Sequence, residues 1–75
     1  MKTMNIRLST ISQVRDFVDT VSKYDGDIDL ESGRYVVDGK SIMGIFSLDL
    51  LSPIKVIAHT DDVDKLFADL EKFKA

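Results

Sequence analysis

One stretch of ten residues is the most informative part of this chain: Gly39-Lys40-Ser41-Ile42-Met43-Gly44-Ile45-Phe46-Ser47-Leu48. A turn leads into a serine that is well placed to cap a short helix, and the helix is rich in large apolar side chains. A helix this short cannot bury all of them, so we expect about half to face the core and half to lie near solvent. Exposed Met and aromatic side chains are favoured at protein contact sites, which indicates a docking surface beside the serine. The alternative is that all of them pack on neighbouring loops.

The residues before this stretch predict a strand, a helix and a hairpin. Residues 5–8 alternate polar and apolar side chains, as a half-buried strand does. Apolar residues over 14–21 follow helical spacing, with Thr10 and Gln13 placed as a capping box and a turn at 24–27 as the end. Residues 28–30 and 34–37 have the composition of strands and flank a turn at 31–33, which predicts a hairpin.

The residues after the stretch predict one more strand and one more helix. Pro53 ends the short helix, and residues 54–58 alternate as a fourth strand. Thr60-Asp61-Asp62 then opens an amphipathic helix whose apolar side includes Leu66 and Leu70. The order βαββαβα predicts an α+β fold, an open-faced sandwich in which one four-stranded antiparallel sheet is covered on one face by three helices. Residues 1–75 form one domain, because a chain of this length builds only one core.

Composition excludes several classes of function. The chain is 44% hydrophobic and 31% charged, which is ordinary globular usage, and it has no cysteine for disulfides, thiolate metal sites or thiol nucleophiles. The net charge of −3 with scattered basic residues argues against direct nucleic-acid binding. No apolar run is long enough for a signal peptide core or a membrane span, so we expect a cytoplasmic protein.

The sequence also lacks the equipment of an enzyme. His59 is the single histidine, and no partner for catalysis or metal binding is evident near it. Asp61 and Asp62 fit a role at the start of a helix better than a cation site, because the calcium-loop pattern is absent. Gly39-Lys40-Ser41 lacks the upstream glycine of a phosphate-binding loop. We therefore expect no enzymatic activity, no cofactor and no metal.

Two short segments resemble the regulatory-serine region of HPr, the histidine-containing phosphocarrier family of the bacterial sugar phosphotransferase system. They are Gly39-Lys40-Ser41-Ile42-Met43-Gly44 and Ser47-Leu48. The βαββαβα order and Phe17-Val18 in the first helix extend the resemblance over most of the chain. By this resemblance Ser41 corresponds to the serine that an ATP-dependent HPr kinase phosphorylates. Ile42, Met43 and Phe46 correspond to the apolar patch that partner proteins contact.

The chain departs from the family at the phosphocarrier centre. Counting back from Phe17-Val18 places Thr10 at the family's active histidine, and Ser12 and Gln13 at its arginine and proline. A phosphohistidine relay needs an imidazole, and a threonine hydroxyl does not replace it without an activating base. The chain is therefore similar to the catabolite-repression HPr-like subgroup, which lacks the histidine and keeps the serine. That similarity implies HPr kinase/phosphorylase and a LacI-type transcription regulator as protein partners.

Two other interpretations stay open at this stage. In the first, the chain is a phosphotransferase-system carrier whose accepting residue has moved to His59. In the second, the fold is kept as a protein-interaction or oligomerisation domain, and Ser41 only caps its helix. The second would suit a self-association surface on the open face of the sheet, where Val36 and Ile57 are expected to point.

Overall fold

The computed structural model describes residues 2–75, and its elements follow the predicted order. Four strands and three α-helices alternate as expected, and a short 3₁₀ helix near the C-terminus was not predicted. Among the described residues no helix is both long enough and apolar enough to cross a membrane. The elements are β1 (Lys2–Ile6), α1 (Ile11–Val21), β2 (Ile28–Ser32), β3 (Tyr35–Asp38), α2 (Ile42–Phe46), β4 (Ile54–Ala58), α3 (Val63–Asp69) and η1 (Glu71–Phe73).

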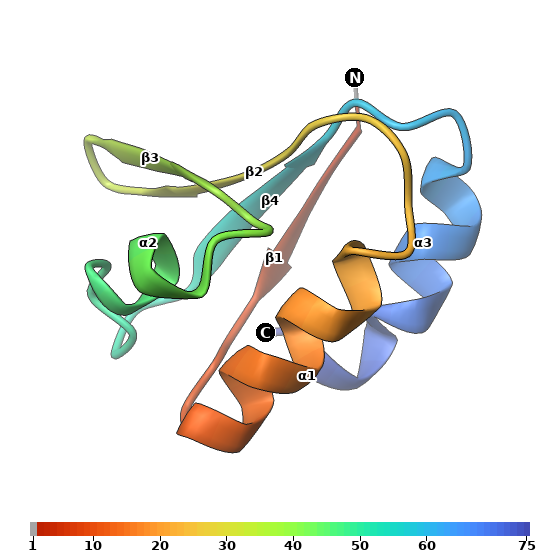
Figure 1. The fold of residues 1–75 in the computed structure, drawn as a ribbon. Helices are drawn as coiled ribbons and strands as arrows, with labels where there is room; N and C mark the ends of the chain where they lie inside the picture. The colour runs from red at the N-terminus through yellow and green to blue at the C-terminus, as the bar shows by residue number, and fades with distance from the viewer. Residues whose placement is uncertain (1) are drawn as a thin grey trace.

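The strands form one antiparallel sheet in the order β1-β4-β2-β3. The helices lie on one face of this sheet, with α2 next to the β2–β3 hairpin and α1 beside α3 (Figure 1). The predicted α+β open-faced sandwich is therefore confirmed. In this order β1 and β3 are the two edge strands, while β4 and β2 pair on both sides.

The core fills the space between the sheet and the helices. Strand side chains such as Ile54 and Val56 are fully buried, as are Val14 and Phe17 on the inner side of α1. The ring of Phe17 meets the ring of Phe73 edge to face, with 6.0 Å between the centroids, so η1 closes the core beside α1. The buried apolar residues form one continuous cluster, as expected of a single domain.

The first strand begins and ends earlier than the predicted range of 5–8. Strand β1 spans Lys2–Ile6, and beyond it the backbone N–H of Arg7 donates to the carbonyl of Phe73 at 2.8 Å. The last residue, Ala75, also donates its N–H to the carbonyl of Asn5. The alternation of residues 5–8 still identified two buried side chains correctly, but the backbone bonds of Arg7 and Asn5 to the C-terminal residues are not revealed by any local pattern.

The hairpin turn also begins two residues later than predicted and ends one residue later. Ser32 pairs with Tyr35, so the two turn residues are Gly33 and Arg34, and not residues 31–33. Gly33 has a φ of 60°, a conformation that a side chain disfavours, while Arg34 has a negative φ. This is the pattern of a type II′ turn, which needs glycine at its first central position.

The second face of the sheet is uncovered and carries mostly polar side chains. The register places Thr3, Ile57, Asp29 and Asp38 in one cross-strand row, and Asn5, Lys55, Glu31 and Val36 in the next. The two apolar members are separated from each other by the acidic side chains of β2. The open face therefore has no continuous apolar surface, which argues against self-association through this face.

Candidate functional site

Ser41 stands at the N-terminus of α2, as the sequence predicted. It has extended backbone dihedrals, and its hydroxyl accepts a hydrogen bond from the N–H of Gly44 at 3.2 Å. Its own N–H donates to the carbonyl of Asp38, the last residue of β3, at 3.0 Å. The serine is half-buried, so its hydroxyl serves as a helix cap while solvent still reaches the residue.

The turn before Ser41 is held in place by its neighbours. The ammonium of Lys40 donates to the carbonyls of Tyr24 and Gly26, at 2.7 and 3.0 Å, so the turn is fixed to the end of α1. Gly39 is buried, and a Cβ atom at this position would stand 2.8 Å from the carbonyl oxygen of Ile28. Lys40 and Gly39 therefore have structural reasons to occupy this turn, independent of any bound partner.

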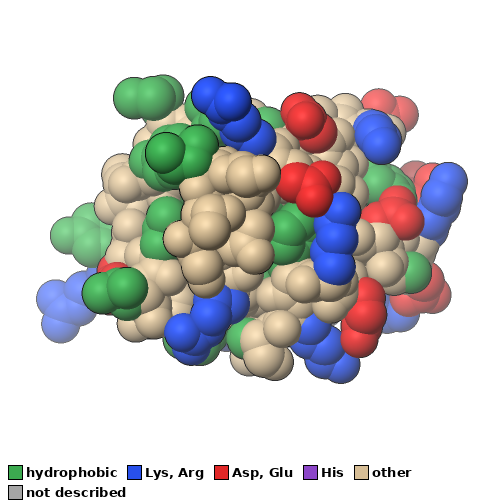
Figure 2. Space-filling view, turned by 90° about the horizontal axis from the view of Figure 1, so that it is seen from below, with side chains coloured by type: hydrophobic (Ala, Val, Ile, Leu, Met, Phe, Trp, Pro, Cys, Tyr) green, Lys and Arg blue, Asp and Glu red, His purple; other side chains and the backbone are tan. Residues whose placement is uncertain are grey.

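The apolar side chains of α2 divide between core and solvent, as expected. Ile45 is fully buried, whereas Met43 and Phe46 are 77% and 40% exposed and lie three residues apart, on one side of the helix. Ile42 is half-buried and packs against the core, so it contributes less free surface than the other two. Figure 2 shows hydrophobic side chains gathered on the α2 side of the molecule, and charged side chains of both signs toward α3.

Two further exposed apolar residues lie near α2 and were not predicted as part of the docking surface. Ile11 begins α1, which packs against α2, and Leu51 follows α2 in the loop leading to β4. Ile11 continues the apolar helical spacing of Val14 and Val18, and this spacing predicts a side chain that faces the core. The spacing does not show that the core ends before Ile11. Leu51 has no periodic signal at all.

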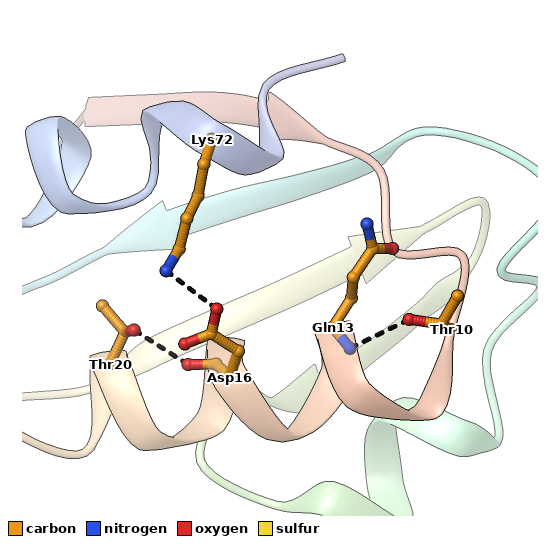
Figure 3. Close-up of polar contacts among 5 residues, drawn as sticks. All are labelled: Thr10, Gln13, Asp16, Thr20 and Lys72. Atoms are coloured by element: carbon orange, nitrogen blue, oxygen red, sulfur yellow. Dashed lines mark hydrogen bonds and ion pairs between the residues drawn. The ribbon is translucent and has the colours of Figure 1, made fainter.

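Thr10 stands at the N-terminus of α1 and caps it. Its hydroxyl accepts from the N–H of Gln13 at 3.1 Å (Figure 3). The Gln13 side chain in turn accepts from the N–H of Ser9 at 2.6 Å. The predicted capping box is therefore wrong in one half, because the reciprocal bond goes to Ser9 rather than to Thr10.

The first helix is fixed firmly behind this cap. The carboxylate of Asp16 forms an ion pair with Lys72 of η1 at 2.8 Å, and its backbone carbonyl accepts from the hydroxyl of Thr20 (Figure 3). Among the described residues, the N–H of Gln13 is the sole hydrogen-bond partner of the Thr10 hydroxyl. No imidazole or carboxylate of residues 2–75 is thus hydrogen-bonded to Thr10 as an activating base.

Thr10 and His59 lie toward opposite ends of the sheet. Thr10 follows the end of β1, and Ile6 there pairs with the first residue of β4. From Ile54 to Ala58, β4 advances four residues, which is about 13 Å at roughly 3.3 Å per residue. His59 follows directly after Ala58. Its imidazole stands 3.4 Å from the carboxylate of Asp29. The structure therefore does not bring His59 together with Thr10.

A polar hollow of about 470 Å³ adjoins His59, between the end of α1 and the start of α3. Tyr24 lines it and donates its hydroxyl to the carboxylate of Asp69. This hydrogen bond, with burial and the negative charges of Asp69 and Asp62, raises the pKa of Tyr24 to about 12. Within residues 2–75 no three acidic, histidine or cysteine side chains are grouped so that they could hold a metal ion.

Comparison with known proteins agrees with the fold. Residues 13–75 match the family model PTS-HPr, described as the PTS HPr component phosphorylation site. A crystal structure of HPr-C-His from Thermoanaerobacter tengcongensis superposes with a TM-score of 0.82 and 31% identity, covering 96% of this chain and 89% of that one. A phosphocarrier protein HPr from Bacillus anthracis str. Ames gives a TM-score of 0.71 and 27% identity, covering 99% and 94% of the two chains.

The fold defines a small protein-binding module of the phosphotransferase type. The chain belongs to the HPr family, which confirms the resemblance drawn from residues 39–48. Proteins of this family are phosphocarriers rather than enzymes, and they interact with other proteins of the phosphotransferase system. The segment that matches the family model begins at Gln13, so Thr10 lies outside it.

Proposed function

We propose that this chain is a cytoplasmic HPr-like regulatory module that lacks the phosphocarrier histidine, is phosphorylated on Ser41 and docks partner proteins through α2. One observation carries the proposal: half-buried Ser41, whose hydroxyl caps α2, stands beside an exposed apolar surface formed by Met43 and Phe46. A phosphate on Ser41 would place about two negative charges beside that surface, and basic side chains of a partner would bind them.

The absence of a histidine relay follows from the residue at the start of α1. Thr10 stands where the family carries its histidine, and its hydroxyl is engaged as a helix cap. A hydroxyl with a pKa far above neutrality needs a base to attack phosphorus, and Thr10 has no base as a hydrogen-bond partner among the described residues. Thr10 therefore stabilises α1, and the chain does not pass a phosphoryl group through this position.

Phosphorylation of Ser41 is compatible with the local structure. A phosphate oxygen can accept from the N–H of Gly44 in place of the hydroxyl, and glycine at this position leaves room beside it. The ammonium of Lys40 already donates to two backbone carbonyls, so the turn can keep its position when Ser41 carries a phosphate. The fold would stay the same, and the modification would act by changing the charge of the surface.

The partners proposed on this basis are HPr kinase/phosphorylase, which would modify Ser41, and a LacI-type transcription regulator, which would bind the phosphorylated form. Met43 and Phe46 supply the exposed apolar area for such contacts, and half-buried Ile42 supports them from below. A small central set of apolar side chains commonly provides most of the energy of an interface. We expect the affinity to depend on both the charge at Ser41 and these side chains.

The experiment that tests the proposal is a phosphorylation assay followed by mass mapping. The protein is incubated with HPr kinase, ATP and magnesium, and an authentic HPr in the same tube shows that the kinase is active. Ser41→Asn is the matched control, because asparagine keeps the helix cap while removing the hydroxyl. One phosphate on Ser41, absent from the variant, is the expected result.

Two other results would point elsewhere. No phosphate on this chain, with the authentic HPr modified, would leave Ser41 as a cap and favour a purely structural module. In a parallel tube with phosphoenolpyruvate and the general phosphotransferase enzyme, acid-labile phosphate on His59 would instead establish a relocated carrier. We expect no such product, because His59 lies among Asp29, Asp61 and Asp62, whose charges repel a phosphoryl donor.

A further inference from the structure

The free edge of the sheet at β3 has features that the proposed docking surface does not explain. Two large apolar side chains are exposed there, Tyr35 at 72% and Val36 at 58%, and neither lies on α2. Figure 1 shows β3 at the outside of the sheet, with β2 as its neighbour on one side only. An edge strand presents unpaired backbone groups that another strand can bind.

The backbone groups that point outward can be identified from the register. The turn Gly33-Arg34 leaves Ser32 and Tyr35 as a hydrogen-bonded pair, and such pairs alternate along an antiparallel ladder. The N–H and C=O groups of Val36 therefore point away from β2. Among residues 2–75, no backbone group outside β2 is hydrogen-bonded to Val36.

The opposite edge of the sheet is protected, whereas among the described residues β3 is covered only at its last residue, where the carbonyl of Asp38 accepts from the N–H of Ser41. At β1 the C-terminal residues pair with Asn5 and Ile6, and Lys2 places a charge on the strand. Lysine, proline and covering segments are the usual protections of an edge. The strand Tyr35–Asp38 has neither lysine nor proline within it, and its two middle residues are valines.

We infer that β3 is a self-association edge, at which two copies of this chain pair antiparallel about a two-fold axis at Val36. This register places Val36 opposite the second copy's Val36, so that the two residues exchange both backbone hydrogen bonds. Tyr35 then lies opposite the second copy's Val37, which covers the exposed ring with an apolar neighbour. Each half of the contact repeats the other, as a two-fold interface requires.

Charge complementarity selects a second copy as the occupant. Arg34 and Asp38 are both exposed, and they lie two residues before and two residues after Val36. In the antiparallel register each Arg34, in the hairpin turn, lies opposite the partner's Asp38, so an ion pair can form on each side of the central valines. In Asp38, Oδ1 accepts from the N–H of Lys40 at 2.9 Å, and the second carboxylate oxygen is left for the partner. The resulting dimer would have a continuous eight-stranded sheet.

The test is sedimentation velocity with charge variants. The interface is one short strand, below standard size, so we expect a dissociation constant between about 10 µM and about 1 mM. Arg34→Asp and Asp38→Arg should each weaken the dimer at least about tenfold, because like charges then face each other across the axis. An equimolar mixture of the two variants should restore association, because every facing pair is again of opposite sign.

Arg15→Asp is the matched control, since it makes the same change of charge on the exposed side of α1. It should leave the dissociation constant unchanged, and circular dichroism checks that each variant is folded. Hydrogen exchange of the Val36 amide should also slow as the protein concentration rises. Three results would each overturn the inference: a protein that stays monomeric at concentrations on the order of 1 mM, an association that the two variants do not weaken, or an equimolar mixture that does not recover association.

Discussion

Removing the hydroxyl of Ser41 should destabilise the protein by an amount that the cap geometry sets. In Ser41→Ala the N–H of Gly44 loses its acceptor, which stands at 3.2 Å in a half-buried position. Loss of such a cap costs about 0.5 to 2 kcal/mol, and the long bond places this one near about 1 kcal/mol. For a domain of this size that corresponds to a fall of about 4 to 8 °C in Tm.

The assay is thermal and urea unfolding followed by circular dichroism. Ser41→Asp and Ser41→Asn are measured beside Ser41→Ala, because both side chains keep a capping oxygen and should stay within about 0.5 kcal/mol of the parent. The slope of the urea transition should be unchanged in all three, which shows that the same folded state is compared. An alanine variant as stable as the parent, or an asparagine variant as unstable as alanine, would refute the assignment of this hydroxyl as a cap.

Three further predictions concern the docking surface, the tyrosine and the turn. Met43→Ser should weaken binding of the phosphorylated protein to its regulator by about tenfold, measured by calorimetry, with little change in Tm because the side chain is exposed. Since the pKa of Tyr24 is raised to about 12, the stability from its bond to Asp69 is fully present below about pH 10 and is lost as the pH rises through 12. Urea unfolding from pH 9 to about 12 should show this loss in the parent and not in Tyr24→Phe. Gly39→Ala should cost about 1 to 3 kcal/mol in the same assay, because its Cβ would stand 2.8 Å from the carbonyl oxygen of Ile28, and an unchanged stability would contradict that contact.

The order and type of the elements could be predicted because the pattern of each is local. Apolar spacing marks the inner side of α1, and alternation marks the buried side of β4, where Ile54 and Val56 are fully buried. The serine cap of α2 is equally local, since Ser41 and Gly44 are three residues apart. Such features need no knowledge of the rest of the chain.

The features that the sequence did not reveal depend on residues far apart in the chain. The end of β1 is decided by bonds from Arg7 to Phe73 and from Ala75 to Asn5. The sequence likewise placed the hairpin turn too early, because the register of β2 against β3 decides which residues form it. The exposure of Ile11 follows from where the core ends, and that depends on packing between elements rather than on spacing within one.

Thr10 and Ser41, which the sequence resemblance places at the family's two phosphorylation positions, are both helix N-caps in this chain, and they differ in their surroundings. At Thr10 the hydroxyl bonds the helix amide and no activating base is hydrogen-bonded to it among the described residues, so a change away from histidine leaves a stable cap without a phosphoryl acceptor. At Ser41 the same kind of cap adjoins exposed Met43 and Phe46, where an added charge alters what a partner meets. A kinase brings its own base and ATP, so Ser41 needs only to be accessible, whereas a relay residue must itself be the nucleophile. Under the proposed function, regulation at Ser41 is therefore independent of a histidine relay.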